Sequence, residues 1–268
     1  MKYRGSILIL CLVLLLLARL SIERREERMT AGNGANKKNI FVLTDKELED
    51  IKSENEEYAK NKVAYLTFDD GPSKVTGKIL DVLKEEDIKA TFFILGTEMN
   101  EEKIEYLKRM HEEGHTIGIH TYSHNYKEIY QSVEAYVEDF YKVYDFLEDT
   151  LGIQIEIFRF PWGSVNQYNK KIRNELIQEM EAKGFRFYDW NVSGEDSTGN
   201  PSGATIKKNT LKNLEKYQSP VILLHDSSIN ENTSLVLSEI IKEIKAKGYR
   251  FDTVEKKEPL HFKQQIEN

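Results

Sequence analysis

The 268-residue sequence contains a single cysteine, Cys11, which lies inside an apolar run near the N-terminus. The folded part of the chain therefore has no disulfide and no thiolate chemistry. An acylated-cysteine lipoprotein signal would need a small residue before the cysteine, where Leu10 stands. We expect Cys11 to serve as a small apolar side chain.

An excess of positive charge is also absent. The 38 Lys and Arg residues are outnumbered by 45 Asp and Glu residues, which gives a net charge of −7. Such a chain offers no broad basic face, so nucleic acid is not expected as a partner. With 40% hydrophobic residues, the chain is long enough to bury the core of one large α/β domain or two small ones.

A hydrophobic run of ordinary membrane-spanning length is missing as well. Apolar residues 7–18 follow Lys2 and Arg4, and they fall short of the roughly 20 residues of a typical span. The segment fits three alternatives: an uncleaved anchor, a cleaved secretory signal, or a buried helix. We favour the anchor because no small-x-small cleavage site follows the run. We predict a signal-anchor or signal peptide over residues 1–22, a linker or stalk over 23–60, and a domain outside the cytoplasm, anchored to the membrane or secreted.

From residue 63 onward, short β-type runs alternate with amphipathic helical patterns. The predicted strands are residues 63–68, 90–95, 116–120, 155–160, 185–192, 220–225 and 249–254. The predicted helices are residues 77–87, 101–114, 133–152, 169–184, 210–218 and 234–248. Repeated strand-helix units predict a parallel sheet, and seven of them fit a closed or nearly closed barrel better than an open sheet.

Polar residues stand where these strands end, which is where α/β folds place their chemistry. They are Asp69 and Asp70, His120 and His124, Arg159, Asp189 and Asp196, and His225 with Asp226. His120 and His124, at i and i+4, are predicted to share one face of a helical turn. Two neutral nitrogens with one carboxylate form the ligand set of a catalytic zinc-type site with an open position, which can activate water.

Four sequence blocks carry a family resemblance: TFDDGP (67–72), HTYSH (120–124), RFPWG (159–163) and LLHD (223–226). In this order they resemble the signature blocks of the polysaccharide deacetylases, carbohydrate esterase family four. The resemblance covers residues 62–254. It implies an α/β fold with a distorted (β/α) barrel of about seven parallel strands, and metal-dependent removal of acetyl groups from N-acetylated sugars.

The same resemblance implies roles for individual residues. Asp69 is similar to the catalytic base, and Asp70, His120 and His124 are similar to the metal ligands. Arg159 resembles the arginine that holds the base, and His225 resembles the general acid. Trp162 falls at the groove-lining aromatic, and Leu223 at the pocket for the acetate methyl.

The fourth family block departs from the pattern, which has an Asp-Trp pair. Aligning residues 190–197 with it places Asp196 at the aspartate, as the partner of His225, and Ser197 where tryptophan is expected. Asp189 and Trp190 form the literal dipeptide, but they lie earlier, inside a predicted strand. The missing tryptophan leaves the accepted acyl group open.

We therefore expect a monomeric domain over residues 61–256 with a C-terminal tail over 257–268, using Zn²⁺ or Co²⁺. The expected activity is N-deacetylation of a β-linked amino-sugar polymer, with peptidoglycan favoured. Alternatives are chitooligosaccharide or acetylated xylan as substrate, or a catalytically weak wall-binding protein. His115 is predicted at the surface, His111 at a helix end, and His261 in a polar tail without a role.

Overall fold

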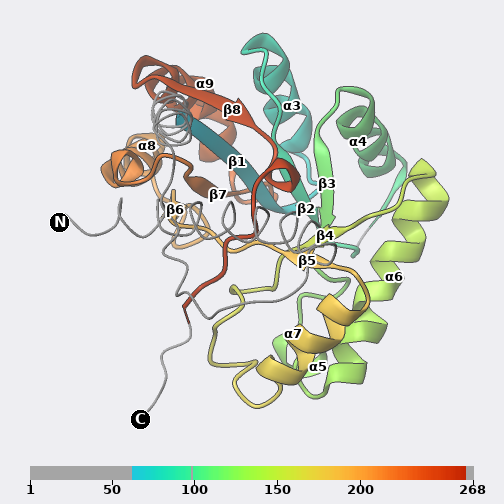
Figure 1. The fold of residues 1–268 in the computed structure, drawn as a ribbon. Helices are drawn as coiled ribbons and strands as arrows, with labels where there is room; N and C mark the ends of the chain where they lie inside the picture. The colour runs from blue at the N-terminus through green and yellow to red at the C-terminus, as the bar shows by residue number, and fades with distance from the viewer. Residues whose placement is uncertain (1–61, 98, 264–268) are drawn as a thin grey trace, which may run out of the picture. The chain divides into compact units, whose positions relative to one another are not determined.

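The computed structural model of the chain describes residues 62–97 and 99–263. Its strands are β1 (Lys62–Gly71), β2 (Thr91–Ile94), β3 (Thr116–Ile119), β4 (Ile157–Phe158), β5 (Arg186–Phe187), β6 (Val192–Ser193), β7 (Val221–His225) and β8 (Tyr249–Asp252). Its α-helices are α3 (Thr76–Glu85), α4 (Glu101–Glu112), α5 (Tyr126–Ile129), α6 (Val133–Leu151), α7 (Arg173–Ala182), α8 (Gly203–Lys212) and α9 (Glu231–Ala246). Two 3₁₀ helices are η1 (Leu214–Lys216) and η2 (Val254–Lys256). Strand and helix alternate, as the sequence predicts (Figure 1).

The predictions for the N-terminal part of the chain lie outside the described residues. They are the signal or anchor segment over residues 1–22, with Cys11, and the linker over 23–60. Among the described residues, no helix combines the length and the apolarity needed to cross a membrane.

The strands form one curled parallel sheet in the order β5-β4-β3-β2-β1-β7-β6, and β8 pairs with β1. Helices surround this sheet (Figure 1). Strand β1 is central, and its residues Val63–Phe68 are buried throughout, as expected for a parallel strand covered on both faces. The prediction of a distorted (β/α) barrel is confirmed.

Helix α6 illustrates why the sequence forms its elements. The Ser132 side chain accepts a hydrogen bond from the Ala135 amide at the start of the helix, and Gly152 ends it in the left-handed conformation. Its apolar residues recur at helical spacing and are buried: Val133, Tyr136, Phe140, Val143 and Leu147. Phe140 packs edge-on against Phe158 of β4, which fixes the helix on the sheet.

Several predicted elements have other bounds in the structure, and for two of them side-chain contacts explain the difference. The strand predicted over residues 185–192 is split into β5 and β6, because the carbonyl groups of Tyr188 and Asp189 between them accept hydrogen bonds from the Arg159 guanidinium rather than from a neighbouring strand. The helix predicted over 210–218 instead begins at Gly203, where the Ser202 side chain caps the first turn.

The described part of the C-terminal tail, residues 257–263, lies against the domain through several contacts. The Asp189 amide donates to the Leu260 carbonyl, and the Phe262 amide donates to the Asp189 carboxylate. The His261 ring stacks on Phe187 with centroids 3.7 Å apart. His261 thus has a packing contact in the tail although its side chain is exposed, and the prediction that it has no functional role stays a prediction.

The prediction that His115 is a surface residue is wrong. Its ring is buried, and Nδ1 accepts a hydrogen bond from the Ala90 amide. Burial lowers the pKa of His115 to about 4, so the ring is neutral at pH 7. This hydrogen bond links the segment after α4 to the segment before β2.

Replacing Phe140 by alanine should lower the free energy of unfolding by about 3–5 kcal/mol, because the ring is fully buried among other aromatic rings. Chemical denaturation of the full chain measures this. Leu235→Ala on α9 is the control, because Leu235 is 68% exposed, and its change should stay within about 0.5 kcal/mol. Equal losses in the two variants would contradict this description of the core.

Candidate active site

The two neighbouring carboxylates at the end of β1 turn to different partners. The pairing of β1 with β2 is irregular between Asp69 and Gly71, and Asp70 has a φ of 70°. This break in the strand lets both side chains reach the C-terminal edge of the sheet. Asp69 approaches Arg159, whereas Asp70 approaches His120 and His124.

His120 stands directly after β3 with a defined tautomer. Its Nδ1 lies 2.9 Å from the Arg159 carbonyl oxygen, which can only accept, so Nδ1 carries the proton. The lone pair is then on Nε2, which lies 3.7 Å from Asp70 Oδ1. The carbonyl thereby orients the His120 ring with Nε2 toward Asp70, in the way that outer partners orient metal-bound histidines.

The prediction that His120 and His124 share a helical turn is wrong. Thr121 and His124 have φ values of 87° and 52°, so the segment is a turn with left-handed residues. The amides of Tyr122 and Ser123 donate to the carboxylate of Asp139 on α6 instead of forming helical hydrogen bonds. The loop still places His124 Nε2 at 3.7 Å from Asp70 Oδ1.

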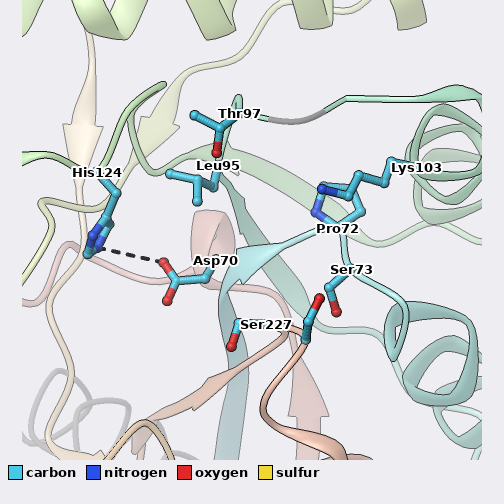
Figure 2. A pocket seen from close by; sticks show the side chains of 9 residues that line it. Asp70, Pro72, Ser73, Leu95, Thr97, Lys103, His124 and Ser227 are labelled. Atoms are coloured by element: carbon cyan, nitrogen blue, oxygen red, sulfur yellow. Dashed lines mark ion pairs between the residues drawn. The ribbon is translucent and has the colours of Figure 1, made fainter.

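The three side chains fit a divalent metal ion. One donor atom each from Asp70, His120 and His124 lies within 4.8 Å of the others. Asp70 Oδ1 is buried and has no hydrogen-bond partner among the residues that the structure describes, so a cation would satisfy it. Burial and the charge of His120 lower the pKa of His124 to about 4, so its ring is neutral at pH 7 as a ligand must be. Figure 2 shows Asp70 and His124 facing each other at the edge of a pocket.

Arg159 fixes the orientation of Asp69. The fully buried guanidinium donates from Nη1 to Asp69 Oδ1 at 2.9 Å and to Thr67 Oγ1 at 2.7 Å. Its remaining side lies against the rings of Phe93 and Trp190. The second oxygen, Asp69 Oδ2, is left 3.8 Å from His120 Nε2, at the ligand cluster.

His225 and Asp196 form the other polar pair. His225 ends β7 opposite Asp69 of β1, and its Nδ1 lies 2.8 Å from Asp196 Oδ1. Asp196 Oδ2 accepts from the His225 amide and from the Thr233 hydroxyl, so the carboxylate is held firmly. Burial alone would lower the pKa of His225, but the hydrogen bond and charge of Asp196, with the charges of Asp69 and Asp70, raise it to about 9.

Comparison with known proteins identifies the family. The family model for polysaccharide deacetylases matches residues 56–185. A peptidoglycan-N-acetylglucosamine deacetylase of Bacillus cereus is 36% identical over 208 residues, which cover 76% of this chain and 72% of that protein. This chain belongs to the polysaccharide deacetylase family.

Two solved structures resemble this deacetylase over most of their length. The catalytic domain of a peptidoglycan N-acetylglucosamine deacetylase from Eubacterium rectale is 33% identical, with a TM-score of 0.71 over 78% of this chain and 94% of that chain. A polysaccharide deacetylase from Bacillus cereus is also 33% identical, with a TM-score of 0.66 over 75% of this chain and 97% of that chain. The enzyme is accordingly a hydrolase of carbohydrate esterase family four.

The two substrate-binding candidates of the deacetylase lie at different depths. Trp162 is 38% exposed, and its ring centroid is 4.4 Å from that of His124. Leu223 is buried on β7 in register with Thr67, one layer below His225. The pocket beside the ligand cluster is lined by other residues: Asp70, Pro72, Ser73, Leu95, Thr97, Lys103, His124, Ser227 and Ser228 (Figure 2).

The altered fourth block of the deacetylase has a clear geometry. Asp196 contacts His225, whereas Asp189 accepts hydrogen bonds from Ser164 and Phe262. Ser197 is exposed. The structure thus brings Asp196, rather than Asp189, to the histidine.

Of the carboxylates that contact the site loops, sequence reasoning missed Asp139, and it placed Asp226 at a strand end without assigning it a role. Asp139 carries a signal in the sequence, because it is an acid on the otherwise apolar face of a helix. Asp226 is visible only as the residue after His225, and its partners Ser73 and Thr76 are distant in the chain.

Replacing Asp196 by asparagine should lower the pKa of His225 from about 9 toward its ordinary value of 6.5, because the charge that favours the imidazolium is removed. NMR titration of the imidazole in metal-free protein measures this. Glu195→Gln is the matched control, since it removes an exposed charge one residue away, and the pKa should stay near 9. An unchanged titration in Asp196→Asn would refute the assigned contact.

Proposed function

We propose that this enzyme removes N-acetyl groups from N-acetylglucosamine in peptidoglycan, with a bound Zn²⁺ or Co²⁺ ion, outside the cytoplasm. The observation that carries the proposal is the convergence of three groups at one edge of the sheet. They are the ligand cluster of Asp70, His120 and His124, the Asp69–Arg159 pair, and the His225–Asp196 pair.

Amide hydrolysis has three requirements that these groups meet. The carbonyl must be polarised, water must lose a proton, and the departing amine must gain one. When bound, a divalent ion would polarise the acetyl oxygen and acidify a water molecule. First-row ions such as Zn²⁺ and Co²⁺ suit two imidazoles and one carboxylate.

Asp69 is the base in this proposal. Arg159 holds Oδ1, so Oδ2 keeps one direction toward the ligand cluster and is available to accept the proton of water. Arg159 is thus a positioning residue for Asp69.

His225 is the acid. Its Nδ1 proton is committed to Asp196, so Nε2 is the nitrogen that donates to the sugar amine, and a pKa of about 9 keeps the ring protonated at neutral pH. Trp162 and Leu223 would contact the sugar and the acetyl methyl, respectively.

Peptidoglycan is the favoured substrate for two reasons. The relatives reported above are named as peptidoglycan N-acetylglucosamine deacetylases or polysaccharide deacetylases. The apolar run over residues 7–18, followed by a charged linker, fits an enzyme tethered at the outer face of a membrane, where peptidoglycan lies. Ser197 stands where the family has a tryptophan. The acyl group that the enzyme accepts is therefore the part of the proposal with the least support.

The test measures acetate released by the metal-depleted full chain before and after Zn²⁺ or Co²⁺ is added. The substrates are purified peptidoglycan, N-acetylglucosamine oligomers and acetylated xylan. We expect negligible release without metal, restored release with metal, and the highest rate on peptidoglycan.

The outcomes separate the alternatives. A higher rate on chitin-type oligomers or on xylan would replace the substrate while retaining the metal chemistry. Binding of peptidoglycan by the metal-loaded chain without acetate release from any of the three polymers would overturn the enzyme proposal in favour of a wall-binding protein.

A further inference from the structure

Two buried carboxylates accept hydrogen bonds from the loops that carry the proposed metal ligands. Neither takes part in the proposed chemistry. Asp226 contacts the loop that contains Asp70, and Asp139 contacts the loop that contains His124. Both are buried, and they come from different parts of the chain, the end of β7 and the middle of α6. Neither approaches the ion site itself as a ligand.

Asp226 holds the Asp70 loop on both sides of the ligand. Its amide donates to the carbonyl of Asp69 at 2.7 Å, before the ligand. After the ligand, its carboxylate accepts from Thr76 Oγ1 at 2.6 Å and from Ser73 Oγ at 3.4 Å. The backbone between these points lies so close to the carboxylate that a Cβ added at Gly71 would collide with it.

These hydrogen bonds stabilise Asp70 in an unfavourable backbone conformation. Its φ of 70° lies in the left-handed region, which a non-glycine residue keeps only where surrounding contacts hold it. Asp70 Oδ1 has no hydrogen bond of its own in the described part of the chain. The direction of this ligand therefore depends on its backbone, which Asp226 holds together with the hydrogen bond from the Leu95 amide to the Gly71 carbonyl.

Asp139 does the same for the turn between the two histidines. Its Oδ1 accepts from the Tyr122 amide at 2.6 Å, and Oδ2 accepts from the Ser123 amide at 3.2 Å. Those amides lie between Thr121 and His124, the two residues of the turn with positive φ. Without the Asp139 carboxylate, these two part-buried amides would lose their acceptor, and the turn would relax.

We infer that Asp139 and Asp226 are positioning residues for the metal ion, each holding one ligand loop in the conformation that binding requires. The inference rests on the proposed function only in assigning Asp70, His120 and His124 as the ligands. Outer partners of metal ligands typically contribute 10- to 100-fold to metal affinity. Asp139→Ala and Asp226→Ala should each raise the Kd for Zn²⁺ by roughly tenfold or more.

The measurement is metal affinity, independent of acetate release. Zn²⁺ binding to the metal-depleted full chain is measured by chelator competition, and the visible absorption of bound Co²⁺ reports the ligand geometry. Asn variants keep one acceptor oxygen at each position, so Asp139→Asn and Asp226→Asn should bind Zn²⁺ more tightly than the alanine variants. Thermal unfolding of the metal-free proteins measures stability separately.

Asp189→Ala is the matched control. Asp189 is also fully buried and accepts hydrogen bonds from Ser164 and Phe262, but the loop that it holds carries no metal ligand. This variant should lose stability while its Kd for Zn²⁺ stays within about threefold of the parent, because the ligand loops keep their outer partners.

A second route covers the case in which Asp226→Ala does not fold. Thr76→Val removes the hydroxyl that donates to Asp226 and accepts from the Ser73 amide, and it leaves the Asp226 carboxylate in place. It should weaken Zn²⁺ binding on its own, and in combination with Asp226→Asn its effect should be less than additive, because both act through one contact.

The inference is overturned if Asp139→Ala and Asp226→Ala lose stability but bind Zn²⁺ as the parent does. It is also overturned if Asp189→Ala loses affinity equally, since the effect would then be general. A protein that shows the expected affinities but releases no acetate supports this inference and contradicts the proposed function.

Discussion

The divergence of two adjacent carboxylates is the constraint on which the rest of the site depends. On a regular strand, Asp69 and Asp70 would point to opposite faces of the sheet. The irregular pairing after Asp69 and the positive φ of Asp70 bring both to the same edge. A left-handed non-glycine residue costs roughly 1–3 kcal/mol, so neighbouring contacts must hold it in place. The fold supplies them through the parallel strands that end beside β1.

The buried polar groups beneath the site orient its side chains more than they stabilise the fold. Arg159 is fully buried, and a buried ion pair stabilises a fold only weakly after the cost of desolvation. Here each nitrogen of the guanidinium donates to a partner: Asp69, Thr67, and the carbonyl groups of Tyr188 and Asp189. Such a network leaves Asp69 with one orientation, which a base requires. Asp196, in the turn that follows the neighbouring strand β6, restrains His225 in the same way.

The sequence predicted the parts of this structure that depend on local pattern. Alternating strands and amphipathic helices specify a parallel barrel, and that topology gathers Asp69, His120 and His225 at one edge. It failed where a distant partner overrides the local pattern. The histidine spacing suggests a helix, but Asp139 takes the amides of the turn, and Arg159 takes the carbonyl groups of a predicted strand. Contacts between residues far apart in the sequence produce no periodic pattern in the sequence, so they could not be predicted from it.

The central claim is that Asp70 holds the ion and Asp69 moves the proton. The most direct test compares Asp69→Asn and Asp70→Asn for the number of Zn²⁺ ions bound per chain and for acetate release. The account predicts that Asp69→Asn binds one ion per chain and releases essentially no acetate, whereas Asp70→Asn loses both. Full acetate release by Asp69→Asn, or unchanged Zn²⁺ binding by Asp70→Asn, would contradict it.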